Sequence, residues 1–400
     1  MTASPVATNT FHFNPESRLY IDGRLRESST GNTAENINPA NEEVLGVTTD
    51  ASSDDMEEAI AAARRVFDTT DWSTNHEFRQ RCLMQLHAAL QQEKEDIRAE
   101  LIAEVGATVG MTYIAQLEWP LADAIRYPAE LISSFAWERM LAQDAKMGMP
   151  YNRVVVKEPI GVVGAITPWN FPFEIISNKV GQILATGNTM VLKPAIETPW
   201  SALRWGRIVA EKTDIPPGVF NIVPTSDNDI AQELVTDPRV DMISFTGSTA
   251  VGQRIQRLSA DAMKRNMLEL GGKSAYLVLD DADMDIALPG CIGALMHSGQ
   301  GCALATRMLV PRSHYDQAVE VASATFGALA VGDPADPNTF CGPLVSAKQR
   351  DRVLNYVEIA KREGGRVTAG GVVPDGLDRG YFVAPTVVAD VAPEDRKSVV

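Results

Sequence analysis

One cysteine of this chain stands in a setting that suits a nucleophile. Cys302 follows Gly299, Gln300 and Gly301, so the backbone around its sulfur is open to an approaching molecule. A thiol reacts as its thiolate and therefore needs access and a neighbour that favours the charged form. A lone cysteine is more often a small buried hydrophobe, and Cys82, within a helical apolar stripe, fits that interpretation. Cys302 is the candidate nucleophile.

Two polar residues near predicted strand ends could assist such a thiol. Glu269 interrupts an apolar run between Leu268 and Leu270, and burial there would raise the pKa of its carboxyl toward that of a general base. Asn170 lies in the segment TPWNFP, whose prolines stiffen the loop that would aim an amide donor at an oxyanion. Each residue alone also fits a simpler role, a solvent-facing carboxylate or a turn former.

Two further segments could bind an anion. Lys193 ends the apolar run NTMVLK, and the residues FTGST follow DMISF just before a helix predicted to begin near Ala250. Hydroxyls and free amides at a helix start form an anion site, which here would suit a pyrophosphate. The pattern is not a GxGxxG fingerprint, and a single lysine is more often an ordinary surface residue.

The elements around these residues predict an α/β fold with a parallel sheet. Between residues 160 and 279 short apolar runs alternate with helical stretches, and the runs are GVVGAI, NTMVLK, VFNIV, DMISF and SAYLVL. In such sheets ligands lie at the carboxyl ends of the strands, where the polar candidates stand. Earlier in the chain, Ser52 and Asp55 predict a capping box before the helical segment MEEAIAAARRVF. Helices are also expected from Arg79 to about Gly106.

Composition excludes several classes of function. The 400 residues carry a net charge of -16, which disfavours nucleic acid and anionic membranes as partners. No apolar stretch approaches the roughly twenty residues of a membrane helix, and the start does not resemble a secretory signal. The cysteines are scattered, as reduced thiols are, and without metal-ligand spacing, so we expect a cytoplasmic protein with no metal site; they are Cys82, Cys291, Cys302 and Cys341.

The motifs TPWNFP, LATGNT followed by VLKPA, FTGST, LELGGK and GQGC, in this order, resemble the aldehyde dehydrogenase superfamily from about Leu19 to about Val391. The resemblance implies a Rossmann-like parallel-sheet domain that binds NAD(P) (residues 18–145 and 160–269) after a flexible tail (1–17). It further implies a small oligomerisation hairpin (146–159), an α/β catalytic domain (270–400) and a homo-oligomeric assembly.

The resemblance also implies roles for the chemical residues. Cys302 would attack an aldehyde to give a thiohemiacetal, whose oxyanion Asn170 and the Cys302 amide would hold. Loss of hydride to the nicotinamide would leave a thioester, and Glu269 would activate the water that hydrolyses it. Relatives that pass the acyl group to coenzyme A typically lack this glutamate, so hydrolysis to the free acid is favoured. Lys179 matches a lysine that the family associates with proton relay.

Lys193 and Ser248 match positions that bind the ribose and the pyrophosphate of the cofactor. Many NAD-preferring relatives have an acidic residue at the position of Ile196, whereas here Glu197 stands one place later. The resemblance therefore favours NAD and also allows NADP. The whole predicted cofactor set is Thr167, Pro168, Trp169, Lys193, Ala195, Glu197, Phe245, Thr246, Gly247, Ser248, Gly252, Leu270 and Gly271.

The chain departs from the family pattern at its end. After YFVAPTVVADV it runs PEDRKSVV and stops, whereas family members continue into an EIFGP-type motif, so the resemblance implies a truncated catalytic domain. One alternative is therefore a catalytically inactive remnant that binds a cofactor or a partner. A second is a cysteine hydrolase that pairs Cys302 with His297.

Overall fold

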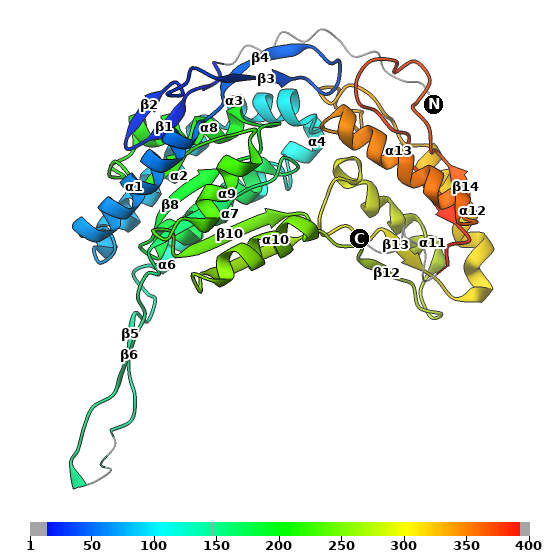
Figure 1. Ribbon diagram of the computed structural model, residues 1–400. Coiled ribbons are helices and arrows are strands. Elements are labelled where there is room, and N and C mark those ends of the chain that lie inside the picture. Colours follow the sequence, from blue (N-terminus) through cyan, green and yellow to red (C-terminus); the bar gives the residue numbers. More distant parts are fainter. Residues whose placement is uncertain (1–13, 144, 146–147, 393–400) are drawn as a thin grey trace.

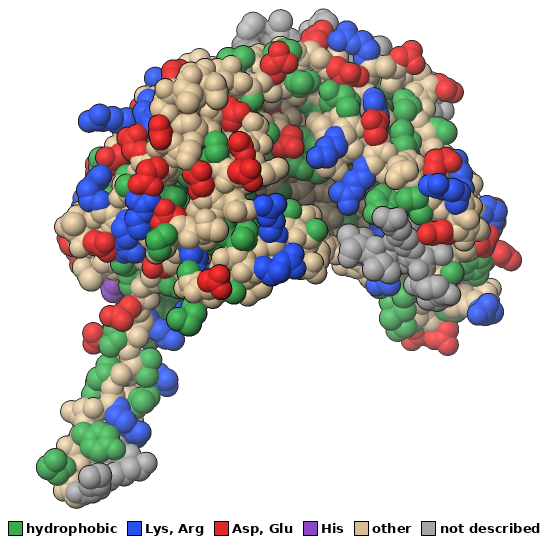
Figure 2. All heavy atoms as spheres, in the orientation of Figure 1, with side chains coloured by type: hydrophobic (Ala, Val, Ile, Leu, Met, Phe, Trp, Pro, Cys, Tyr) green, Lys and Arg blue, Asp and Glu red, His purple; other side chains and the backbone are tan. Residues whose placement is uncertain are grey.

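The computed structural model describes residues 14–143, 145 and 148–392, so most of the predicted tail of residues 1–17 lies outside the described residues. Figure 1 shows a larger N-terminal lobe built around a sheet, a smaller C-terminal lobe beside it, and a thin hairpin that projects from the N-terminal lobe. The space-filling view shows a hollow between the two lobes (Figure 2).

A seven-stranded sheet forms the centre of the N-terminal lobe, in the order β11-β10-β7-β8-β9-β1-β2. The strands from β11 to β9 are parallel, whereas β1 pairs antiparallel with both β9 and β2. This arrangement confirms the predicted α/β fold with a parallel-sheet core. The strands are β1 (Leu19–Ile21), β2 (Arg24–Arg26), β7 (Val162–Ile166), β8 (Thr189–Lys193), β9 (Phe220–Ile222), β10 (Met242–Gly247) and β11 (Arg265–Leu270).

Helices cover both faces of this sheet, which explains why its central strands are almost continuously apolar. Consecutive residues of one strand enter different cores: Val162 packs with α1, α9 and α10, and Val163 with α2, α7 and α8. The predicted capping box of Ser52 and Asp55 is confirmed at the start of α1. The helices are α1 (Ser53–Thr69), α2 (His76–Gln92), α7 (Pro172–Ala185), α8 (Trp200–Lys212), α9 (Asn228–Thr236) and α10 (Thr249–Ala260).

Shorter helices follow α2 along the chain. The predicted helical region from residue 79 to 106 consists of α2, α3 and a π-helical turn that ends at Gly106, whose φ is 70°. A left-handed glycine is a common helix terminator. These elements are α3 (Lys94–Glu100), the π-helix (Leu101–Val105), α4 (Val109–Thr112), α5 (Glu118–Asp123) and α6 (Arg126–Leu131), while β3 (Thr33–Ile37) and β4 (Val44–Thr49) form a separate pair.

The expectation that SAYLVL adds a strand to the main sheet is wrong. β12 (Ala275–Leu277) pairs in parallel with β13 (Arg307–Leu309) in the C-terminal lobe. A parallel neighbour of β11 would require a crossover of a dozen or more residues, and only residues 271–274 separate β11 from β12. The lobe also contains α11 (Met284–Ala287), a 3-10 segment (Pro289–Gly299), α12 (Tyr315–Gly327), α13 (Ala347–Arg362), β14 (Arg366–Ala369) and β15 (Val387–Ala389).

The projecting hairpin pairs β5 (Glu138–Met140) with β6 (Val154–Val156). The predicted range 146–159 contains β6, whereas β5 lies before it, because an antiparallel strand needs a partner on the other side of the turn. Met140, Val154 and Val156 expose 61%, 46% and 51% of their surface. The hairpin therefore presents apolar side chains to solvent.

Candidate active site

The carboxyl edge of the parallel sheet gathers the predicted motifs. Strand order reverses at β7, which lies between β8 and β10, and ligands bind at such a switch point. The register places Ile166 beside Lys193 on one side and beside Phe245 on the other. Thr246 stands beside Glu269 on β11. Segments as far apart in the sequence as Ile166 and Glu269 therefore end at one edge, which faces the C-terminal lobe (Figure 1).

Asn170 connects this edge to the thiol loop. Its Nδ2 donates a hydrogen bond to the carbonyl oxygen of Gln300 at 2.6 Å, and its own carbonyl oxygen accepts one from Gln116 Nε2 at 2.7 Å. Asparagine Nδ2 carries two N–H groups, so the second can serve a substrate oxygen. The predicted oxyanion donor and the predicted nucleophile are thus brought together, two residues of backbone apart.

The loop before Cys302 has an unusual backbone. His297, Ser298 and Gly299 have consecutive positive φ values of 49°, 56° and 79°. Such conformations cost free energy for residues other than glycine, and they persist where the surroundings hold them. Ser298 Oγ donates to the carbonyl oxygen of Gly342 at 2.9 Å, which ties the loop to the segment before α13.

The side chain of Gln300 makes several hydrogen bonds that hold this loop. Its Nε2 donates to the carbonyl oxygens of His297 and Pro343, both at 3.3 Å, and its Oε1 accepts from the Val345 amide at 3.1 Å. Together with the Asn170 bond to its backbone, these contacts fix the residue two positions before Cys302. Hydrogen bonds of the Gln300 side chain thus fix the backbone of this loop, as backbone hydrogen bonds fix the helices and strands.

Cys302 is exposed, whereas the three other cysteines are buried. Burial raises the pKa of the Cys82 and Cys341 thiols to about 12 and also raises that of Cys291. Those three thiols stay protonated and shielded. The interpretation of Cys82 as a packing residue is confirmed, and access to Cys302 agrees with its flanking glycines.

The expected burial of Glu269 is wrong, because its side chain is exposed on β11. β11 is the edge strand, so its alternate side chains reach solvent, and Leu268 and Leu270 on either side are half-buried. The turn that follows approaches the thiol loop: a Cβ built on Gly272 would lie 3.5 Å from the Cys302 carbonyl oxygen. Glu269 therefore lies three residues before the glycine that approaches the thiol loop, and its side chain is within reach of water.

Lys179 projects from α7 toward the sheet. It is 8% exposed, and its Nζ donates to Ser244 Oγ on β10 at 2.8 Å. Burial lowers the pKa of Lys179 to about 8, an effect that the negative charge of Glu269 opposes. A lysine with this pKa can gain or lose a proton near neutrality.

The predicted anion site stands at the start of α10. Ser248 is the N-cap, and its Oγ accepts a hydrogen bond from the Val251 amide at 3.4 Å. A Cβ on Gly252 would lie 2.7 Å from Leu270 Cδ2, so glycine allows α10 to pack closely on β11. The first turn of this helix directs its N–H groups past the end of the sheet, where an anion would be stabilised.

Around the switch point, Thr167 and Lys193 are joined by a backbone hydrogen bond of 3.1 Å. Burial lowers the pKa of Lys193, and the negative charges of Glu197 and Asp50 oppose this shift. Thr167 Oγ1 is buried without a hydrogen-bond partner among the described residues. The remaining predicted positions are buried at Ala195, Phe245 and Thr246, half-buried at Pro168, Trp169 and Gly247, and exposed at Gly271.

Residues 25–398 match the aldehyde dehydrogenase family. The 3-succinoylsemialdehyde-pyridine dehydrogenase of Pseudomonas sp is 38% identical over 377 residues, which cover 93% of this chain and 76% of that protein. The chain belongs to the aldehyde dehydrogenase family. The family prediction is confirmed, and with it the classification as an oxidoreductase of the aldehyde dehydrogenase type.

Solved aldehyde dehydrogenases share the fold over most of their length. The Mycobacterium tuberculosis aldehyde dehydrogenase complexed with NAD+ superposes with a TM-score of 0.91 at 36% identity, over 96% of this chain and 79% of that chain. A mutant of aldehyde dehydrogenase C (AldC) from Pseudomonas syringae, in complex with NAD+ and octanal, has a TM-score of 0.90 at 31% identity, over 96% and 77%.

His297, the histidine of the hydrolase alternative, is buried and packs edge-on against Phe171 at 5.0 Å between ring centroids. Burial lowers its pKa to about 4, although a hydrogen bond to the Asn170 backbone opposes this shift, so the ring is neutral at physiological pH. Its Nε2 has no hydrogen-bond partner among the described residues. This aldehyde dehydrogenase therefore shows no bonded cysteine–histidine pair within the part of the chain that the structure describes.

Three residues of the site were not predicted from the sequence. Gln116 and Gln300 support Asn170, and Ser244 receives Lys179. Ser244 could have been noticed, because it is a polar residue between the apolar residues Ile243 and Phe245 of the run DMISF. Gln300 stood inside the GQGC motif without an assigned role, and Gln116 had no signal because its partner lies 54 residues away.

Described residues contain no helix long and apolar enough to cross a membrane. They also contain no group of three or more His, Cys, Asp or Glu side chains that could hold a metal ion.

Proposed function

We propose that this protein oxidises an aldehyde to the carboxylic acid with NAD(P)+, through a covalent intermediate on Cys302. The observation that carries the proposal is the contact between motifs: exposed Cys302 follows the carbonyl of Gln300, which Asn170 Nδ2 binds at 2.6 Å. A nucleophile and a fixed amide donor on one loop are what acyl chemistry requires.

Each chemical residue then has a task. The Cys302 thiolate attacks the aldehyde carbon, and the developing oxyanion accepts hydrogen bonds from Asn170 Nδ2 and the Cys302 amide. Once a thioester has formed, Glu269 takes a proton from water, and its exposure gives that water a path. Lys179, with its pKa lowered to about 8, can exchange protons through Ser244. The product is the free acid.

The residues at the sheet edge fit a nicotinamide dinucleotide. The start of α10 with Ser248 would hold the pyrophosphate, Lys193 the adenosine ribose, and the unpartnered Thr167 Oγ1 leaves a buried polar atom for the ligand. NAD+, when bound, supplies the acceptor for the hydride that leaves the aldehyde carbon. The NAD+ complexes of similar enzymes favour NAD, and Ile196 without an acidic side chain also allows NADP.

We also propose the division of labour among segments. Residues 18–145 and 160–269 bind the cofactor, and residues 270–400 belong to the catalytic domain. The hairpin of β5 and β6, with exposed Met140, Val154 and Val156, serves to join copies into a homo-oligomer. A cytoplasmic location stays a prediction.

The test is turnover by the purified 400-residue chain. A panel of aldehydes is offered with NAD+ and with NADP+ separately, and reduced cofactor is followed by its absorbance. Turnover that disappears in Cys302→Ala supports the proposal. A folded protein that binds NAD+ in a titration but oxidises none of the aldehydes would overturn it in favour of an inactive cofactor-binding protein.

A further inference from the structure

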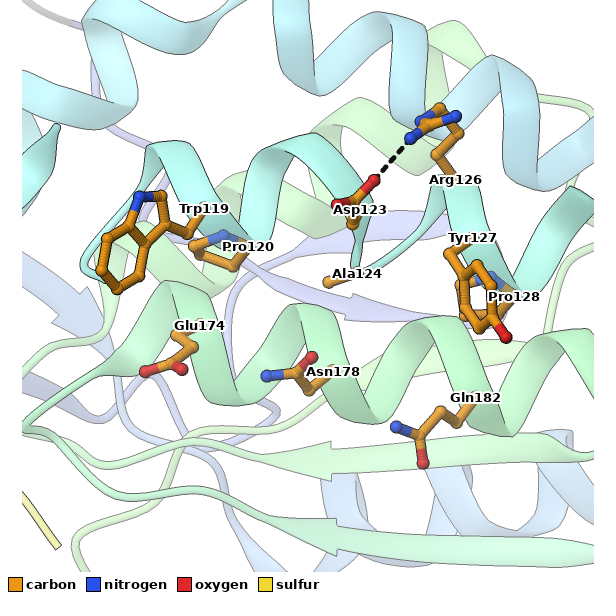
Figure 3. Close-up of a pocket in the computed structure, with 10 residues that line it drawn as sticks. All are labelled: Trp119, Pro120, Asp123, Ala124, Arg126, Tyr127, Pro128, Glu174, Asn178 and Gln182. Atoms are coloured by element: carbon orange, nitrogen blue, oxygen red, sulfur yellow. Dashed lines mark hydrogen bonds and ion pairs between the residues drawn. The ribbon is translucent and has the colours of Figure 1, made fainter. Parts of the chain in front are cut away.

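A groove of about 570 Å³ lies between α7 and the helix pair α5 and α6 (Figure 3). One wall is a single face of α7, formed by Glu174, Asn178 and Gln182 at intervals of four residues. The opposite wall is formed by Trp119, Pro120, Asp123, Ala124, Arg126, Tyr127 and Pro128. Figure 3 shows Trp119 and Glu174 at the same end of the groove.

That end is the one nearer to the reaction centre. α7 begins at Pro172, and Glu174 stands about one helical turn after Asn170, the residue that binds the thiol loop. The opposite wall is tied to the same residue, because Gln116, three positions before Trp119, donates to the Asn170 carbonyl oxygen. The other face of α7 carries Lys179 toward the sheet. The groove therefore extends away from the catalytic loop along α7.

The groove has an excess of negative charge. Arg126 is engaged by Asp123 at 2.5 Å and by Glu130 at 3.1 Å. Glu174 is half-buried, its carboxylate has no hydrogen bond or ion pair among the described residues, and burial raises its pKa. A carboxylate withdrawn from water without a partner is unfavourable, and a cation beside it would recover the lost free energy.

Exposed aromatic rings accompany this carboxylate. Trp119 and Tyr127 each expose 61% of their surface, although rings of this size are usually covered. At Tyr113, by contrast, a cation of the protein already lies over the ring, because the Arg98 guanidinium carbon is 4.1 Å from the ring centroid. No cation lies over Trp119 or Tyr127 in the described contacts. Aromatic faces next to a carboxylate are a suitable environment for an alkylated ammonium group.

We propose that this groove binds the tail of an aldehyde substrate that carries a positively charged, alkylated ammonium group, with Glu174 as counter-charge and Trp119 as the aromatic face. The inference rests on the proposed oxidation at Cys302 and names its substrate class. A carboxylate tail would meet Glu174 and Asp123, while the only cation of the groove is already paired. A long alkyl tail would cover Glu174 and the amides of Asn178 and Gln182 without satisfying them.

The first experiment compares isosteric aldehydes. One member of each pair ends in a trimethylammonium group and the other in a tert-butyl group of the same shape, at several chain lengths. We expect the wild-type protein to favour the cation by about tenfold or more in kcat/KM. In Glu174→Gln this preference should fall about tenfold while turnover of the tert-butyl aldehydes stays the same. The matched control Glu320→Gln, an exposed carboxylate of α12, should leave both unchanged.

The second experiment needs no turnover. Propyltrimethylammonium, a tail without the aldehyde, should bind the NAD+-saturated protein and change a tryptophan fluorescence signal that is absent in Trp119→Phe. Glu174→Gln should weaken this binding about tenfold.

Equal kcat/KM for the two isosteres, unchanged in Glu174→Gln, would overturn the substrate class and leave the oxidation itself intact. Binding of the cation without oxidation of any aldehyde would instead contradict the proposed function. Absence of both binding and preference overturns the inference.

Discussion

Two regions of the site position their residues by different means. At the sheet edge, Thr167, Lys193 and Thr246 follow or end buried strands, and the backbone ladder and the two cores around it set their places. The loop of Cys302 has no such ladder. It is held by side-chain bonds of Gln300, Ser298 and Asn170 to carbonyl oxygens and one amide.

This difference in how residues are held predicts which property, stability or rate, a substitution in each region should change. Residues at the sheet edge share the stability of the whole lobe, so changes there should alter unfolding as well as binding. The thiol loop depends on a few bonds at an exposed surface, so changes there should alter the rate far more than the stability. Reactivity and fold stability are thus largely separated between the two regions.

Substitutions of two cysteines should separate the effect on activity from the effect on stability most clearly. Cys302→Ala should lower turnover about a thousandfold or more and leave the thermal midpoint almost unchanged, because the side chain is exposed. Cys82→Ala should do the reverse, with a loss of about 1 kcal/mol of stability and normal turnover, because it leaves a small cavity. Turnover and thermal unfolding of both variants check this, and normal rates in Cys302→Ala would contradict the mechanism.

A somewhat smaller effect is expected at Glu269, at the boundary of the two regions. Glu269→Gln should allow the thioester to form and then slow its hydrolysis about a hundredfold. Rapid mixing should show one equivalent of reduced cofactor per active site, followed by a slow phase. A uniform decrease of both phases would mean that Glu269 acts before the thioester forms.

Gln300 tests whether side-chain bonds hold the thiol loop. Gln300→Ala removes the contacts with His297, Pro343 and Val345, and we expect kcat to fall about tenfold through misplacement of Cys302. NAD+ affinity, set at the sheet edge, should stay the same. Gln92→Ala, an exposed amide at the end of α2, is the matched control for kcat. Equal losses of kcat and of NAD+ affinity would show that the regions are coupled.

At Lys179 we expect a change in the pH dependence of stability. Its pKa falls from 10.5 to about 8 on folding, because the buried charge is unfavourable. Between these values the unfolded chain keeps a proton that the folded protein has lost, so the free energy of unfolding rises with pH, by roughly 1.4 kcal/mol for each pKa unit. The buried thiols of Cys82 and Cys341 titrate in the same interval with the opposite sign, so the comparison is with Lys179→Met: denaturant unfolding should give a more positive slope of the free energy of unfolding against pH in the wild-type protein than in the variant. Equal slopes in both would contradict the assignment.

Sequence reasoning succeeded where local pattern and motif order carry the information. The apolar runs of β7, β8, β9 and β10 predicted the parallel sheet, and Ser52 with Asp55 predicted the start of α1. It failed for SAYLVL, because an apolar run does not show which sheet a strand joins. It also failed for the burial of Glu269, because alternating leucines do not show that β11 is an edge strand.

The sequence by itself determined the fold class, the family and the order of its motifs, since periodicity and motif spacing are properties of the linear chain. Only the tertiary structure decided which side chains meet. Asn170 reaches Gln300 across 130 residues, Lys179 reaches Ser244 across 65, and Trp119 faces Glu174 across the groove. Such contacts depend on how helices cross the sheet and on the hydration free energy that each side chain loses on burial. Neither is determined by residues that are neighbours in the sequence.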